Sequence, residues 1–147
     1  MRERGIHLVS LGAEIGVEVH LNQNPSFFSN HPVEGRAENW AIFVYGYKNK
    51  SEICYLVGLH ELGHVVNEHT IGQERELWYD DHILEGEAEA WNWALDNTRE
   101  KFSAYALNWI LDYPIKTYLR NSPHENGYPG PSYHKLVERI RLAPFFN

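Results

Sequence analysis

The residues SEICYLVGLHELGHVVNEH, from Ser51 to His69, predict a long helix with a chemically unusual face. Ser51 is a good N-cap, and no proline interrupts the residues that follow it. Apolar residues recur at helical spacing and continue into two histidines on the same stripe. The members of this stripe are Ile53, Leu56, Val57, His60 and His64. Two imidazoles on a buried face need a shared partner that offsets their loss of hydration.

His60 and His64 are separated by one helical turn, so both rings can point at one metal ion. A catalytic zinc ion takes three protein ligands, leaves one position for water, and accepts both imidazole and carboxylate. Glu61 projects about 100° away from His60, where it can reach that water and act as general base. The H-E-x-x-H pattern alone is only suggestive, because the chain has nine histidines and twenty acidic residues.

The third ligand can be selected by helical phase in the segment Glu85-Gly86-Glu87-Ala88-Glu89. This segment belongs to a helix that Asp80 or Asp81 caps and that runs to about Asn97. At about 100° per residue, Glu87 lies within an apolar stripe, whereas Glu85 and Glu89 lie on the opposite, solvated face. The stripe comprises Ile83, Leu84, Ala90, Trp91 and Ala94. A carboxylate there must be protonated, paired or metal-bound, so Glu87 is predicted as the third zinc ligand; the alternative is a buried pair with an Arg or His.

The remaining sequence predicts an α+β fold in a single domain over residues 1–147. Further helices are expected over residues 3–15, 100–112 and 133–140, and strands over 17–21 and 40–47. Gly16 ends the first helix, and Pro114 breaks or restarts the third. Residues 22–39 are expected to form a loop or a loop with a short hairpin, and residues 121–132 an irregular segment. We expect a small, mostly antiparallel sheet packed on a helix bundle, with the metal between two helices.

Composition excludes several classes of protein. The formal net charge is −7 and no Lys/Arg-rich block occurs, which excludes the electrostatic footprint of a nucleic-acid-binding protein. The single cysteine, Cys54, cannot form an internal disulfide and fits a reducing compartment. No apolar run suits a signal peptide or a membrane span. We therefore expect a cytoplasmic protein with no membrane partner; its oligomeric state is left open.

The segments His60-Glu61-Leu62-Gly63-His64 and Glu85-Gly86-Glu87-Ala88-Glu89-Ala90-Trp91 together resemble the zincin peptidases of the ImmA/IrrE family. The resemblance covers roughly residues 5–98 and implies a zincin-like fold, zinc binding by His60, His64 and Glu87, and catalysis by Glu61. Trp91 stands where the family usually has Phe, and the partners that orient the histidines are unassigned. Family members cleave repressor-like regulators of mobile elements or stress responses, so the resemblance implies a protein or peptide substrate.

With this site complete, zinc would lower the pKa of its bound water to about 7, and Glu61 would pass the proton to the leaving amine. The strand over 40–47, as an edge strand, could hold an extended substrate; an ordinary core strand is an equal alternative. An oxyanion donor is also needed. The candidates are Tyr79, His82, Tyr128, Tyr133 and His134, with Tyr133 and His134 preferred, although each alone is more often a surface or packing residue.

Two other functions compete with that of a zinc endopeptidase. The first is a catalytically weak binding module that keeps the fold and the metal but sequesters a protein partner. The second is a protein in which zinc only holds two helices together. An intact Glu61 argues against both, because neither has a use for a base beside the ligands. The other histidines (His7, His20, His31, His69 and His124) are expected to be structural or solvent-exposed.

Overall fold

The computed structural model describes residues 2–22, 34–38, 41–46, 51–67, 81–115 and 131–142. Its helices are α1 (Arg2–Ile15), α2 (Ser51–Val66), α3 (Asp81–Asn97), α4 (Ala104–Ile110) and α6 (Pro131–Arg141), and a π-helical turn, η2 (Leu111–Ile115), follows α4. The strands are β1 (Glu18–Asn22), β2 (Glu34–Glu38) and β3 (Ala41–Tyr45). This content confirms the α+β class. No helix among these residues is long and apolar enough to cross a membrane.

The chain reverses between α1 and β1 at Gly16, as the sequence predicts. Gly16 has a φ of 87°, a left-handed conformation that glycine adopts without steric cost and that commonly ends helices. The amides of Gly16 and Val17 both donate to the carbonyl of Gly12, at 2.8 and 2.7 Å, which closes the last turn. Strand β1 then alternates between half-buried and exposed residues, so the predicted half-buried strand is confirmed.

The three described strands form a sheet in the order β1-β3-β2. Strand β3 pairs in parallel with β1 and antiparallel with β2, so the sheet is mixed and not mostly antiparallel as expected. The parallel pair is possible because the segment between β1 and β3 is long enough for a crossover. Strand β3 is central, with Ile42 and Val44 fully buried, so the alternative of a core strand holds and the predicted edge position is wrong.

Strand β2 lies within residues 22–39, where the sequence predicts a loop or a loop with a short hairpin. Its residues EGRAE include none of the β-branched or aromatic types that favour strands. The strand exists because β3 offers a partner along its whole length, from Glu34 opposite Tyr45 to Glu38 opposite Ala41. Tertiary pairing has overridden local propensity here.

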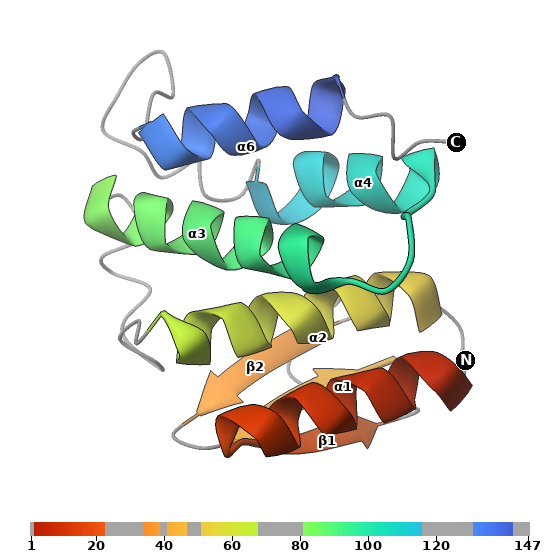
Figure 1. Ribbon diagram of the computed structural model, residues 1–147. Helices are drawn as coiled ribbons and strands as arrows, with labels where there is room; N and C mark the ends of the chain where they lie inside the picture. The colour runs from red at the N-terminus through yellow and green to blue at the C-terminus, as the bar shows by residue number, and fades with distance from the viewer. Residues whose placement is uncertain are drawn as a thin grey trace.

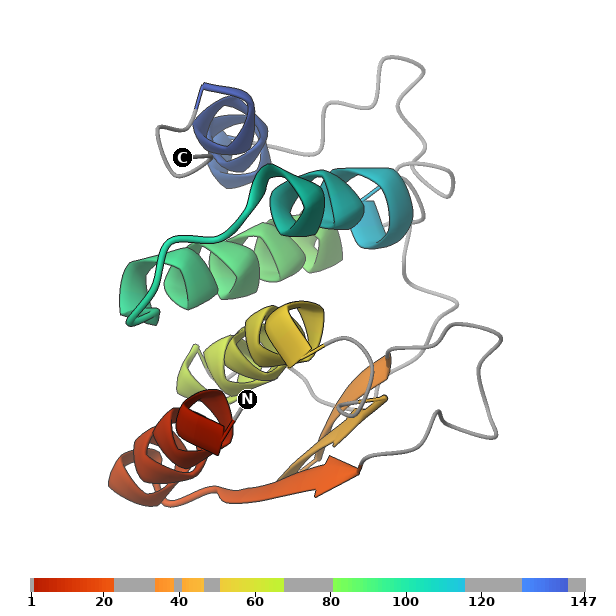
Figure 2. The ribbon, with the colours of Figure 1, turned by 90° about the vertical axis from the view of Figure 1, so that its right-hand side faces the viewer.

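Helix α2 is the centre of the molecule (Figures 1 and 2). The sheet and α1 lie on one side of it, and α3 and α4 on the other, with α6 packed beyond α3. Every residue from Ile53 to Gly63 is buried. The sequence predicts one buried stripe, but a helix that is apolar around its circumference can be covered on all sides. The metal motif therefore lies on the most enclosed helix of the described structure.

The C-terminal helices begin and end where local chemistry dictates. Helix α4 starts after Ser103, whose hydroxyl accepts a hydrogen bond from the amide of Ala106, so it is shorter than the predicted helix over 100–112. Pro114 lies inside η2. Helix α6 begins at Pro131, two residues earlier than predicted, because proline suits the first turn of a helix.

Candidate metal centre

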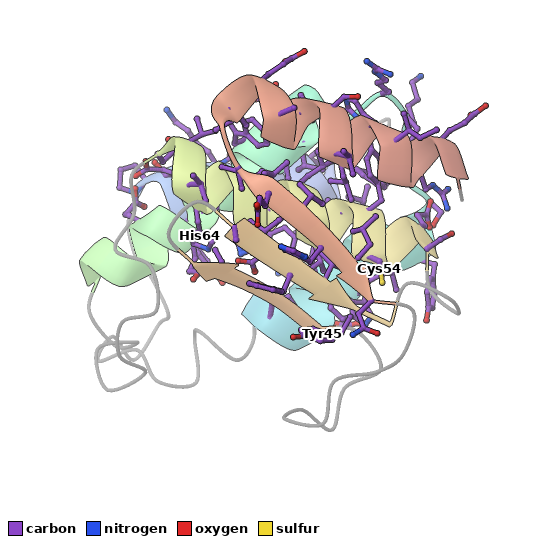
Figure 3. All side chains as sticks on the ribbon, turned by 90° about the horizontal axis from the view of Figure 1, so that it is seen from below. Tyr45, Cys54 and His64 are labelled. Carbon is purple, nitrogen blue, oxygen red and sulfur yellow. The ribbon has the colours of Figure 1, made fainter. Side chains whose placement is uncertain are left out.

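Three side chains from two helices converge on one point. The Nε2 atoms of His60 and His64 lie 3.0 Å apart, and the Glu87 Oε2 atom lies 3.0 Å from the first and 3.1 Å from the second. The two histidines come from the C-terminal half of α2, and Glu87 comes from the N-terminal half of α3. Figure 3 shows His64 towards one end of α2, with Cys54 and Tyr45 towards the other.

This arrangement fits a metal ion. The three ligating atoms form a nearly equilateral triangle with sides of 3.0 to 3.1 Å. Tetrahedral zinc with ligand bonds of about 2.0 to 2.1 Å separates its ligand atoms by about 3.3 Å, so a shift of a few tenths of an ångström is enough. Among the described residues, these three are the group of His, Cys, Asp and Glu side chains that could hold a metal. Two imidazoles and a carboxylate form a donor set typical of several divalent transition metals.

Charge in the cluster favours a cation. Burial by itself would lower the pKa of His64, but the carboxylate of Glu87, with a smaller contribution from Glu61, raises it to about 9. Burial would likewise raise the pKa of Glu87, yet His64 and His60 hold it well below its ordinary value. Glu87 is therefore ionised, and the positive charge beside it is a proton that a metal ion can replace.

Glu61 follows His60 in α2 and lies on a different side of the helix, beneath β2. Its side chain is buried, with 9% of the residue exposed. A Cβ atom added at Gly35 of β2 would lie 2.9 Å from both Cγ and Oε1 of Glu61. Gly35 therefore lets the strand approach the carboxylate closely. Because Glu61 also contributes to the raised pKa of His64, its charge acts on the metal cluster without belonging to it.

The close approach of α2 and α3 depends on Gly63. A Cβ atom added at this position would lie 2.7 Å from the carbonyl oxygen and 3.0 Å from the Cα atom of Ala90. These are backbone atoms of the neighbouring helix, so they cannot rotate away. Gly63 is next to His64, and Ala90 lies three residues after Glu87, so this contact brings the two halves of the ligand set together.

The three acidic residues of α3 have different environments. Glu87 joins the histidines, and Glu89 is exposed, as the helical phase predicts. Glu85 is half-buried, and its carboxylate accepts hydrogen bonds from the amides of Ser132 and Tyr133, at 3.2 and 3.1 Å. The prediction that Glu85 lies on a solvated face is therefore wrong: it caps the N-terminus of α6, which the sequence does not place beside α3.

The two preferred oxyanion donors, Tyr133 and His134, both lie on α6. Tyr133 is a core residue of α6, 5% exposed, and burial raises its pKa to about 12 even though Arg141 lowers it. His134 is exposed on the surface of the same helix. Tyr79, Tyr128 and the side chain of His82 lie outside the described residues. Of the other histidines, His7 is buried in the core and His20 is exposed, in line with their predicted non-ligand roles.

Trp91, which the sequence places on the same stripe of α3 as Glu87, has a contact with the candidate metal cluster that was not predicted. Its ring stacks on that of His60, with centroids 3.7 Å apart and planes inclined by 21°. The signal was present, since Trp91 lies four residues after Glu87 and therefore on the same face of α3. By contrast, no local signal indicates that Gly35 lies beside Glu61, because that contact depends on sheet pairing.

Comparisons of the chain with protein-family models, curated proteins and solved structures found no match. The function is therefore inferred from the chemistry of these side chains.

Proposed function

We propose that this chain is a zinc-dependent endopeptidase of the zincin type, similar in its site to the ImmA/IrrE family. The observation that carries the proposal is the convergence of His60 Nε2, His64 Nε2 and Glu87 Oε2 within 3.1 Å of one another, with the carboxylate of Glu61 adjacent in sequence. The described residues supply three ligands of this type, which would leave a fourth position for a reacting group, whereas structural zinc sites are closed by four.

Zinc, when bound, supplies Lewis acidity towards a water molecule and a peptide carbonyl. The chain's own residues do the rest. Glu61 accepts a proton from the attacking water and delivers it to the leaving amine, which a carboxylate can do when it is held in place and ionised. Its burial beneath β2 restricts its motion, and its distinct direction from α2 keeps it out of the ligand set.

Among the described strands, β2 lies at an edge of the sheet, and Gly35 of this strand lies beside Glu61. The unpaired main chain of an edge strand can bind an extended peptide by hydrogen bonds that do not depend on its sequence. We assign to β2 the substrate-holding role that the sequence suggested for residues 40–47. This assignment places the peptide next to the base, and so supports cleavage of an extended segment of a protein.

The decisive experiment compares the native chain with Glu61→Gln. Zinc per chain would be measured by atomic absorption, and cleavage would be followed with casein and with a library of internally quenched peptides. We expect one zinc ion in both proteins and a loss of cleavage of at least about 10²-fold in the variant, since general-base catalysis contributes about 10² to 10⁴. The control is Glu89→Gln, which changes an exposed carboxylate and should retain both properties.

Two results would overturn the proposal. The first is an absence of zinc from the carefully purified native chain, and the second is equal cleavage by Glu61→Gln. A native chain that binds one zinc ion and cleaves none of the substrates would instead indicate a non-catalytic zinc module.

A further inference from the structure

Trp91 is placed to control the orientation of a metal ligand. The indole is 2% exposed and stacks face to face on the imidazole of His60, with ring centroids 3.7 Å apart. The His64 ring meets the His60 ring edge-on, at 78° and 4.5 Å. Helix geometry pairs these residues twice: His60 and His64 are one turn apart on α2, and Glu87 and Trp91 are one turn apart on α3. His60 and His64 thus share Glu87 as a neighbour, and His60 also stacks on Trp91.

Histidine ligands of metals are normally oriented by a neighbouring group, most often a carboxylate or a carbonyl that binds the second ring nitrogen. A stacked aromatic ring acts differently. It restricts the tilt of the imidazole plane and leaves the edge of the ring, with its nitrogen atom, free to face the metal. The plane of the His60 ring lies against that of Trp91, and its Nε2 atom lies 3.0 Å from Glu87 Oε2.

We propose that Trp91 is a positioning residue for His60, which it holds by stacking in the orientation required for metal binding. The proposal rests on the metal centre of the proposed function, but it does not require peptidase activity. Stacking carries the effect and no hydrogen bond does, because Trp91 Nε1 is buried with no hydrogen-bond partner in the described structure. Phenylalanine, which is also a flat aromatic ring, should therefore substitute for Trp91, whereas an aliphatic residue should not.

The first test measures the dissociation constant for zinc in Trp91→Phe and Trp91→Leu with a competing chelator. We expect Trp91→Phe to stay within about threefold of the native chain, and Trp91→Leu to bind zinc about 10- to 100-fold more weakly, as is usual when a residue that orients a ligand is lost. A core variant of similar instability, Leu107→Ala on α4, should retain native affinity. Equal affinities for Trp91→Leu and the native chain would overturn the proposal.

The second test uses fluorescence in place of binding affinity. Co²⁺ accepts the same kinds of ligand as Zn²⁺, and a bound Co²⁺ ion quenches most strongly the indole that lies nearest to it. Titration with Co²⁺ should quench the native chain and Trp93→Phe equally, because Trp93 is two residues further along α3 and faces a different direction. Trp91→Phe should lose that quenching while it still binds the metal. Undiminished quenching in Trp91→Phe would contradict the stacked geometry.

The two proposals fail in different ways. If the native chain bound neither Zn²⁺ nor Co²⁺, the proposal of a metal centre would itself be refuted. A native chain that binds both, with no dependence on residue 91, would leave the metal centre intact and refute only the role of Trp91.

Discussion

Three glutamates on one helix show how environment assigns chemistry to identical side chains. Glu87 is ionised beside two histidines, Glu85 caps α6, and Glu89 is exposed. Helical phase separates Glu87 from the other two, because phase depends only on local geometry. It cannot separate Glu85 from Glu89, since the partner of Glu85 comes from 47 residues further along the chain.

His7 is a buried titratable residue that lies away from the candidate metal centre. Its Nδ1 atom forms a short contact with the hydroxyl of Tyr55, which also accepts a hydrogen bond from the amide of Arg99 at 3.2 Å. Neutral His7 can accept the Tyr55 proton at Nδ1, whereas a protonated ring would present a second donor. Burial lowers the pKa of His7, and Arg99 lowers it further, against a smaller opposite effect of Glu14.

We therefore predict that His7 makes stability depend on pH. A histidine whose folded pKa lies below its unfolded value binds fewer protons in the folded state, so its contribution is complete above about pH 6.5 and is lost as the pH falls below it. The free energy of unfolding in urea should fall less between pH 7.5 and 5.5 in His7→Gln than in the native chain. A matched change at the exposed His20 should leave the native pH dependence intact; a parallel fall in His7→Gln would contradict the prediction.

At the level of elements, α2 and α3 form the framework of the site. Both helices carry a ligand-bearing face, and Gly63 against the backbone of Ala90 sets how closely the faces approach. Helix α2 has no solvated side between Ile53 and Gly63, so it cannot move away from one neighbour without pressing on another. The separation of the ligands is therefore a property of the packing of the whole helix.

Gly63→Ala should disrupt this framework. The added methyl group meets backbone atoms, so overpacking should cost about 1 to 3 kcal/mol, offset by up to about 1 kcal/mol from the better helix propensity of alanine. Because the helices must separate, the dissociation constant for zinc should rise at least about tenfold. Both quantities can be measured by urea unfolding and chelator competition.

The control for this substitution lies on the same helix. At Gly58 an added Cβ atom would meet the ends of the Leu8 side chain, at 2.8 and 3.0 Å, and these can rotate. Gly58→Ala should therefore retain native zinc affinity. If Gly63→Ala bound zinc as tightly as Gly58→Ala, the helix contact would not determine the ligand geometry.

An element could be predicted from the sequence where the interactions that form it join residues close together in the chain. Helices α1, α2 and α3 and strand β1 have local periodicity and caps, and they were predicted within a few residues of their observed bounds. Strand β2 has no such signal and forms only because β3 pairs with it. The same distinction applies to the site: His60, His64 and Glu87 follow from phase within helices, whereas Gly35 beside Glu61 depends on strand order.

The described elements form two packed layers that meet along α2 and α3, where the candidate metal centre lies. The sheet, α1 and α2 form one layer, and α3, α4 and α6 form the other (Figure 2). Other polar contacts join the layers at the far end of α2, where Arg4 binds Glu100 at 2.8 Å and Glu52 accepts a hydrogen bond from the amide of Ser103 at 3.0 Å. A metal ion held by α2 and α3 would join the two layers at the opposite end of α2.

Such a bridge predicts that zinc stabilises the entire fold. A ligand that binds only the folded state at 100 times its dissociation constant adds about 2.7 kcal/mol to the free energy of unfolding. For a chain of this size, that increment corresponds to a rise in Tm of about 5 to 10 °C. Thermal unfolding followed by circular dichroism, with zinc and with a chelator, measures the difference directly.

Variants distinguish stabilisation by a zinc ion that joins the two layers from a nonspecific effect of zinc on Tm. Glu87→Ala removes the only proposed ligand on α3 and leaves both histidines on α2, so the ion could still bind weakly but could no longer join the layers. We expect this variant to lose most of the rise in Tm, whereas Glu61→Gln, Glu85→Ala and Glu89→Ala should retain it. Glu85→Ala should instead lower Tm with and without zinc alike, because it removes the cap of α6. An undiminished rise in Glu87→Ala would place the ion elsewhere and break the link between the metal and the cohesion of the two layers.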